Sequence, residues 1–162
     1  MSDTYDFILK LRAIRQYTDN PVSREDLERI VEAARWTGSS KNTQNWSFLV
    51  FTDRDKLDGL AECGSFTDPI RNATAAIVLV KEPEGYEFDI GRAAQNIMLA
   101  AKAIGVASCP ITLHKQEVVE SFLDLENGQV VRYAVALGYP AEEAAPARFG
   151  GRKESERLVR WI

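Results

Sequence analysis

The amino-acid sequence predicts an α+β fold, because strand-like apolar runs alternate irregularly with segments of helical periodicity. Ala75–Val80 is a continuous apolar run of the kind buried on both faces of a sheet. Residues 23–38 instead place apolar side chains at helical spacing behind a Ser cap. The 162 residues suit one domain, residues 1–162, with a core of its own, about five helices and about four strands.

The N-terminal region predicts two helices. Thr4–Leu11 is a short helix with Phe7, Ile8 and Leu11 on its apolar side. Asn20-Pro21 then breaks the chain, and Ser23 is placed to cap a helix that Gly38 would end. We expect this helix to serve mainly as a packing element.

Strands and helices follow in the middle of the chain. Trp46–Thr52 is apolar and rich in β-prone residues, so we expect a buried strand. Asp53 can cap a helix over residues 54–63. Residues 64–72 are expected to be a loop, because Pro69 prevents a regular strand. Ala75–Val80 is the next buried strand.

The second half continues the alternation. Residues 91–104 form an alanine-rich helix with small residues on most sides, which favours close packing, and Gly105 caps its end. Residues 106–113 are extended but interrupted by Pro110, which suits an exposed edge. Residues 115–125 form an amphipathic helix, and residues 130–139 form a last strand.

The C-terminal region is polar and then apolar. Ala141–Ala147 is expected to be a loose loop, and Gly150-Gly151 precedes two cations, Arg152 and Lys153. The last five residues include Leu158, Trp161 and Ile162. This is much apolar surface for a free terminus, so we expect the tail to dock on its own core or on a partner.

Charge and composition exclude several function classes. The net charge of −4 argues against a general nucleic-acid binder. One His and two Cys do not supply a standard zinc site, and no metal site is predicted. We interpret Cys63 and Cys109 as buried thiols. No signal peptide and no apolar run of membrane-spanning length is apparent, so we expect a cytoplasmic protein without membrane contact.

Two polar groups of residues indicate a ligand site. Arg12 and Arg15 point the same way if their segment is helical, although they could equally be a solvated surface pair. The run Gly38–Asn45 carries many hydroxyl and amide groups and precedes an apolar strand. Two cations plus many hydrogen-bonding groups suit a phosphorylated ligand with a polar ring.

The same residues carry a resemblance to a known family. The motifs resemble those of nitroreductase-like flavoproteins, in order and at suitable spacing along nearly the whole chain. They are Arg12–Tyr17, similar to R-S-x-R-x-F/Y; Ser39–Trp46, similar to S-S-x-N-x-Q-P-W; the helix Asp89–Ala101; and Gly105–Ile111, similar to G-L-x-S-x-x-I.

This resemblance implies a mainly antiparallel sheet flanked by helices, and a homodimer that binds FMN at its subunit interface. The C-terminal tail would pack on the partner subunit. Arg12, Arg152 and Lys153 would bind the FMN phosphate, next to Ala13, which occupies the motif position that contacts this phosphate. Arg15 would lie near flavin N1. The N–H groups of Thr112 and Leu113 would face N5 and O4. The second subunit would contribute three side chains: Ser39, Ser40 and Asn42.

The chain departs from the family pattern at several positions. Leu11 stands where many members have an arginine, and Ala13 replaces a serine that touches the phosphate. Asn45 replaces a proline, and Leu113 stands where glycine is frequent. The connection between Val80 and Asp89 is too short for the covering helices of larger members. We therefore expect a thinner phosphate site and an open, shallow substrate site.

The resemblance implies an FMN-dependent NAD(P)H oxidoreductase that follows a ping-pong route through flavin N5. The acceptor would be a nitroaromatic, a quinone or a similar molecule. No side chain is required as catalytic acid or base. His114 could donate a proton or be structural, and Cys109 has a reactive alternative to its buried one. Two other functions stay open: flavin degradation or dehalogenation on the same scaffold, and a non-catalytic dimeric flavin-binding module.

Overall fold

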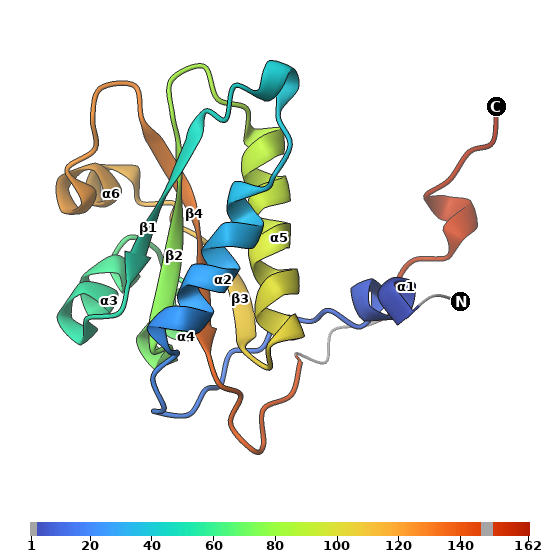
Figure 1. Cartoon of the computed structure of the whole chain (residues 1–162), viewed down its shortest axis with the longest axis horizontal. Helices are drawn as coiled ribbons and strands as arrows, with labels where there is room; N and C mark the ends of the chain where they lie inside the picture. The colour runs from blue at the N-terminus through green and yellow to red at the C-terminus, as the bar shows by residue number, and fades with distance from the viewer. Residues whose placement is uncertain (1–2, 147–150) are drawn as a thin grey trace.

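The computed structural model describes residues 3–146 and 151–162. Its centre is an antiparallel sheet with the strand order β1-β2-β4-β3 (Figure 1). The prediction of an α+β fold with a mainly antiparallel sheet is confirmed. The strands are β1 (Trp46–Phe51), β2 (Ala75–Lys81), β3 (Ala107–Thr112) and β4 (Val130–Gly138).

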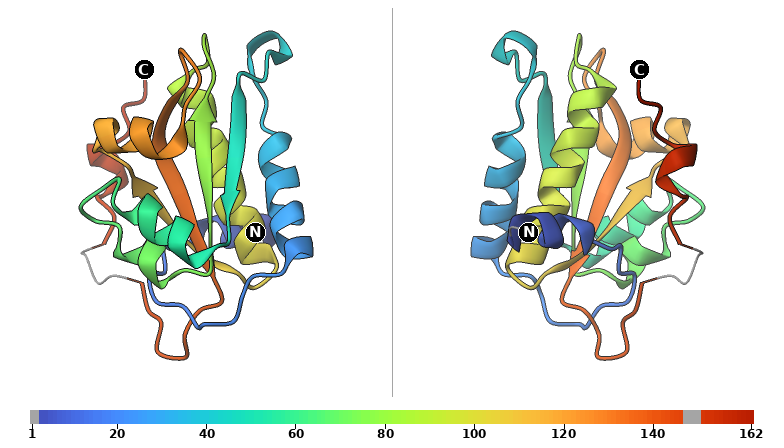
Figure 2. Two further views of the ribbon diagram at one scale, coloured as in Figure 1. Left: turned by 90° about the vertical axis from the view of Figure 1, so that its left-hand side faces the viewer. Right: turned by 90° about the vertical axis from the view of Figure 1, so that its right-hand side faces the viewer.

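Helices lie on both faces of this sheet. The α-helices are α1 (Asp3–Leu9), α2 (Arg24–Arg35), α3 (Arg54–Ala61), α4 (Asp68–Asn72), α5 (Glu87–Ala103) and α6 (Gln116–Leu123), and the 3-10 helices are η1 (Ser40–Asn42) and η2 (Ser155–Arg157). Helices α2 and α5 cover one face, while α3, α4 and α6 cover the other (Figure 2). The sheet is thus the middle layer of three.

Strand β2 shows why its sequence is apolar throughout. Successive side chains of a strand point to opposite faces. Accordingly Ile77 and Leu79 pack in the core on the α2 and α5 side, and Val78 and Val80 pack in the core on the other side. Because both faces are covered, neither set can be polar.

Several predicted boundaries are confirmed by their hydrogen bonds. The Ser23 hydroxyl accepts from the Asp26 N–H at 3.1 Å at the start of α2. The Asp53 carboxylate accepts from the Lys56 N–H at 3.0 Å at the start of α3. Gly105 follows α5 with a φ of +79°, the conformation that a helix C-terminus favours for glycine.

Other expectations are corrected. Residues 64–72 are not all loop, because α4 begins at Asp68 and holds Pro69 in its first turn, where the missing N–H costs no helical bond. Helix α2 ends at Arg35, before Gly38, and α5 begins at Glu87, before Gly91.

Strand β1 is only half buried, contrary to the expectation for Trp46–Thr52. It lies at the edge of the sheet, so one side of its backbone has no neighbouring strand among the described residues. Edge position is decided by how the whole chain pairs, and the composition of β1 alone does not reveal it.

Both ends of the chain leave the body of the molecule. Helix α1 has no buried residue, and the tail exposes Leu158 (64%) and Trp161 (93%) (Figure 1). Docking of the tail on a partner stays a prediction. Two residues of the expected C-terminal loops, Ala147 and Gly150, lie outside the described residues. Within residues 3–146 and 151–162, no helix is long and apolar enough to cross a membrane.

Candidate functional site

The segment that carries the two predicted arginines runs along the free edge of the sheet. Strand β3 is an edge strand, and its Ser108 carbonyl accepts a hydrogen bond from the Ile14 N–H at 3.0 Å. Three residues further on, Tyr17 forms an isolated bridge with the segment that follows β4. Arg12 and Arg15 flank Ile14, so these contacts fix the backbone of both beside β3.

Tyr17 holds the bend of this segment. Its hydroxyl donates to the Ile14 carbonyl at 2.7 Å, and burial raises the pKa of Tyr17 far above its usual value, so the hydroxyl keeps its proton. The Tyr17 ring lies over Gly138, where an added Cβ would come within 2.8 Å of the Tyr17 Cβ. A side chain at position 138 would displace Tyr17 and, with it, the nearby Arg15, so this position requires glycine.

A cavity of about 570 Å³ opens where Arg15 meets β3. This volume is in the range of small-molecule sites. Its walls come from Arg15 and Gln16, from Phe66 before α4, from residues 109–112 of β3, and from His114. Arg15 is exposed and has no ion-pair partner among the described residues. The uncompensated charge of Arg15 thus lines a cavity that is large enough for a ring system, the ring-sized cavity.

The edge of β3 offers one hydrogen-bond donor where the sequence predicted two. The Leu113 N–H donates to the Arg132 carbonyl at 2.8 Å, as part of the ladder between β3 and β4. Donors alternate sides along an antiparallel strand, so the Thr112 N–H points away from β4 toward the open edge. Thr112 also lines the cavity. The backbone donor available there is that of Thr112.

Arg12 lies beside a second cavity, of about 390 Å³, next to the start of β3. Its Nη1 donates to the carbonyls of Leu9 and Leu11, both at 2.7 Å, and so closes the end of α1. Its other guanidinium N–H groups have no partner within the described chain. Ala13 packs half-buried against the core and brings no hydroxyl.

The predicted polar loop is held in a strained conformation. Lys41, Asn42 and Gln44 have φ values of 53°, 56° and 53°, which cost non-glycine residues free energy. The Ser39 hydroxyl accepts from the Gln44 N–H at 3.0 Å and so closes the turn. Ser40 and Asn42 remain exposed. Strain of this kind persists where the surroundings impose it, and it often accompanies a binding role.

Helix α5 holds this loop through its first half. Arg92 donates to the Gly38 carbonyl at 2.8 Å, and the Asn96 amide donates to the Thr37 hydroxyl at 2.9 Å. The arginine segment lies instead at the other end of α5, near Gly105 (Figure 1). The 11 residues from Arg92 to the end of α5 at Ala103 correspond to about 16 Å of helix. The loop and the arginines of one chain are therefore at opposite ends of the fold.

The tail cations are also apart from the arginine segment. Arg152 and Lys153 are exposed, and no hydrogen bond or ion pair joins either to Arg12 or Arg15 in the described parts of the chain. The tail and α1 both leave the body but are separated across its width (Figure 2). One chain thus brings together Arg12, Arg15 and Thr112, and places the loop and the tail elsewhere.

The ring-sized cavity also includes Phe66, a residue that sequence analysis did not assign. Phe66 is 86% exposed, although it is a large aromatic residue, and it lines this cavity. Its signal in the sequence is an aromatic residue inside a polar Gly-Ser-Phe-Thr stretch. His114 also lines this cavity, and its Nε2 lies 3.1 Å from the Ser65 hydroxyl. The histidine ring therefore has a local partner.

Both cysteines are buried, as predicted. Burial raises the pKa of the Cys63 thiol and that of the Cys109 thiol. Arg15 opposes this shift at Cys109 but does not overcome it. A neutral thiol is a poor nucleophile, so Cys109 is a packing residue at the back of the cavity.

Sequence comparison assigns the family. A family model described as the nitroreductase family matches residues 8–83 and 67–139. A protein of Archaeoglobus fulgidus, provisionally named NADH dehydrogenase/NAD(P)H nitroreductase, is 34% identical over 154 residues, which cover 88% of each chain. The chain therefore belongs to the nitroreductase family, and the resemblance seen in its motifs is confirmed.

Solved structures share the same fold. An FMN-dependent nitroreductase of Clostridium difficile is 28% identical, with a TM-score of 0.81 and 96% of both chains covered. A protein of Desulfovibrio desulfuricans, provisionally described as a nitroreductase and solved in complex with FMN, is 27% identical, with a TM-score of 0.85. That match covers 100% of this chain and 98% of the other.

Proposed function

We propose that this protein is an FMN-dependent NAD(P)H oxidoreductase of the nitroreductase type that works as a homodimer. The observation that carries the proposal is the uncompensated Arg15 beside the open edge of β3, at a cavity of about 570 Å³. The relatives support it, because one carries a provisional NAD(P)H nitroreductase name and another is solved with FMN.

The charged residues suit the two anionic parts of FMN. The phosphate is close to a dianion and requires several cations, which Arg12, Arg152 and Lys153 can supply beside Ala13. Arg15 would lie near N1 and the C2 carbonyl, where the flavin gains negative charge on reduction. Because Arg15 has no carboxylate partner in the described chain, its charge remains available for this role.

The backbone edge of β3 suits the opposite side of the ring. Flavin N5 and O4 accept hydrogen bonds, and the Thr112 N–H points into the open edge where such an acceptor can lie. The Leu113 N–H is used within the sheet. Thr112 therefore carries this role in the proposal, and Leu113 contributes packing as a fully buried side chain.

The separation of these groups within one chain supports the proposed homodimer. Ser39, Ser40 and Asn42 lie about 16 Å along α5 from the arginine segment, so they would reach the flavin of a second copy. A two-fold axis would then build each site from both chains. The tail, with Trp161 93% exposed, would pack on the partner and carry Arg152 and Lys153 to its phosphate.

The bound FMN would supply the redox chemistry by accepting hydride from NADH or NADPH at N5 and passing electrons to a second substrate. The chain's own residues bind and orient, and no side chain is needed as acid or base. The connection from β2 to α5 is a turn of five residues, Glu82–Tyr86, and provides no lid. An open site suits successive binding of a nicotinamide and a nitroaromatic or quinone acceptor at one place.

Anaerobic titration of the purified protein with NADH and NADPH tests the proposal. We expect FMN absorbance that bleaches with at least one donor and returns on addition of a nitroaromatic or a quinone. Steady-state rates should give parallel double-reciprocal lines for a ping-pong route. Bound FMN that neither donor bleaches would favour a non-catalytic flavin-binding module. Protein that cannot be loaded with FMN would reject the proposal.

A further inference from the structure

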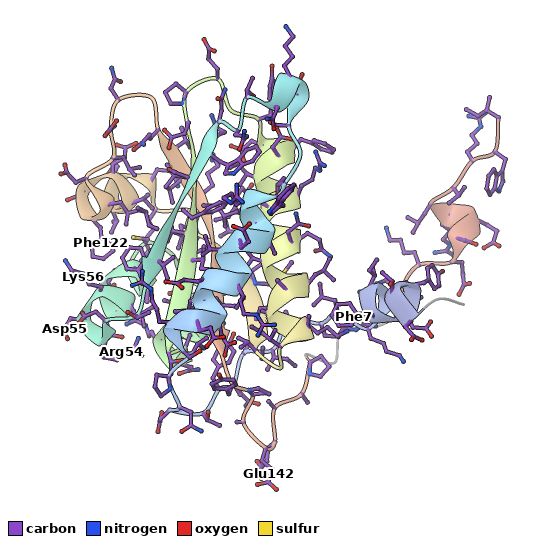
Figure 3. All side chains as sticks on the ribbon, in the orientation of Figure 1. Phe7, Arg54, Asp55, Lys56, Phe122 and Glu142 are labelled. Atoms are coloured by element: carbon purple, nitrogen blue, oxygen red, sulfur yellow. The ribbon has the colours of Figure 1, made fainter. Side chains whose placement is uncertain are left out.

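The second cavity, of about 390 Å³, lies between the end of α1, the last turn of α5 and the start of β3. Three cationic side chains line it: Lys10, Arg12 and Lys102. Ser108 of β3 also lines this cavity. Figure 3 shows Phe7 of α1 pointing toward the same end of α5. Residues from three distant parts of the sequence thus meet at this cavity.

The three positive charges have no counter-ion in the part of the chain that the structure describes. None of them has an ion-pair partner among residues 3–146 and 151–162. Partial burial lowers the pKa of Lys102, and the neighbouring charges of Lys10 and Arg12 lower it further. Like charges held this close repel each other, so an anion bound among them would be stabilised.

This cavity continues the ring-sized cavity along one strand edge. Ser108 lines the cavity of about 390 Å³, and residues 109–112 of the same strand line the cavity of about 570 Å³. The arginine segment borders both, because Arg12 lies at one and Arg15 at the other. A flat ring at Arg15 with a phosphorylated chain extending toward Arg12 would therefore follow the edge of β3.

We propose that Lys102 is a cofactor-binding residue that contacts the phosphate of FMN. The inference rests on the proposed function and adds a residue that the family motifs do not supply. Leu11 and Ala13 leave the phosphate without the arginine and the hydroxyl that the family pattern contains at those positions. Lys102 replaces the missing cation from the last turn of α5.

Lys102 also anchors α1, and this second role must be separated from the first. Its Nζ donates to the Phe7 carbonyl at 2.8 Å and lies 4.6 Å from the centroid of the Phe7 ring. An ammonium group has three donors, so the bond to Phe7 leaves two for phosphate oxygens. A purely anchoring role would affect every flavin equally, whereas phosphate contact affects FMN alone.

Comparison of FMN with riboflavin, which has no phosphate, tests the assignment. The dissociation constants of both would be measured on the apoprotein by quenching of flavin fluorescence. For Lys102→Met we expect the FMN constant to rise about ten- to a hundredfold, as for loss of a charge-assisted hydrogen bond, with the riboflavin constant unchanged. Lys102→Arg should keep FMN binding close to wild type, because it keeps the charge.

Lys56→Met is the matched control, because Lys56 lies on α3 at the far side of the molecule from Phe7 (Figure 3). It should change neither constant. Equal weakening of FMN and riboflavin in Lys102→Met, or no weakening at all, would overturn the assignment and leave the proposed function standing. Wild-type apoprotein that binds neither flavin would overturn both.

Discussion

At the scale of single residues, Arg15 is the side chain closest to the proposed chemistry. Its backbone is fixed by the Ile14–Ser108 hydrogen bond and by Tyr17, while its charge is uncompensated within the described chain. A fixed cation beside N1 would stabilise the negative charge that the flavin gains on reduction. The protein would thus raise the reduction potential of the cofactor through one positive charge.

The substitution Arg15→Ala should lower the reduction potential of bound FMN. Loss of a charge-assisted interaction of about 1.5–3 kcal/mol corresponds to about 30–60 mV for a two-electron couple. Spectroelectrochemical titration measures this shift, and Arg15→Lys should recover much of it. An unchanged potential in Arg15→Ala would refute the role.

Cys109 is predicted to be inert at neutral pH. It is 2% exposed, and burial raises the pKa of its thiol, so the folded state holds the neutral form. In Cys63→Ala protein, a thiol reagent at pH 7.5 should label Cys109 slowly in the native state and rapidly after unfolding. Because the folded pKa is raised, this thiol's contribution to stability is complete below its ordinary pKa. It is then lost as the pH rises through the raised value. Rapid native labelling would contradict this interpretation.

At the scale of elements, the site depends on how the N-terminal segment packs against β3 and β4. The Thr18 N–H donates to the Tyr139 carbonyl at 2.8 Å, and the Ala141 N–H donates to the Gln16 carbonyl at 3.2 Å. These bonds pair the segment with the chain beyond β4, while Tyr17 covers Gly138. The backbone that carries Arg12 and Arg15 is therefore held in position by the edge of the sheet.

The substitution Gly138→Ala should damage both fold and site. Its Cβ would meet the Tyr17 ring and Cβ within 2.8–2.9 Å, and Tyr17 cannot easily move away because its backbone is bridged to Pro140. We expect the free energy of unfolding to fall by about 1–3 kcal/mol in urea, with weaker FMN retention. Gly91→Ala is the control, because a Cβ there meets no atom within 4 Å. Equal stability of the two variants would argue against the packing role of Tyr17.

Local chemistry explains which elements could be predicted from the sequence. The helix after Ser23 and the helix after Asp53 begin where their side-chain caps place them. Helix α4 was missed because Pro69 was interpreted as a strand breaker, although proline suits a first helical turn. The half-burial of β1 was missed because the order of strands depends on pairing between distant segments.

The candidate site was predictable only in part. Their spacing and the motif resemblance both identified Arg12 and Arg15 in the sequence, but only the tertiary structure places them beside β3. The Leu113 N–H is bonded to the Arg132 carbonyl and is not available to a ligand, because of the strand register, which short motifs do not reveal. Lys102 carries no sequence signal of its own, because its position beside Arg12 arises from the packing of α1 against the end of α5.

At the scale of the whole molecule, the groups expected around one flavin are distributed over opposite ends of the chain. The arginine segment lies near the end of α5, and the strained loop with Asn42 lies near its beginning (Figure 1). A single copy cannot bring them together without breaking α5. Two copies related by a two-fold axis can, which makes shared sites between two copies the central claim.

FMN stoichiometry of a hybrid dimer tests this claim most directly. One subunit would carry Arg12→Ala and the other Asn42→Ala, with different affinity tags for purification of the mixed species. Each homodimer should retain FMN poorly, because every site lacks one contact. In the hybrid, one site lacks both contacts and the other is complete, so we predict one tightly bound FMN per dimer. A hybrid that binds no more FMN than either homodimer would show that Arg12 and Asn42 do not meet across an interface.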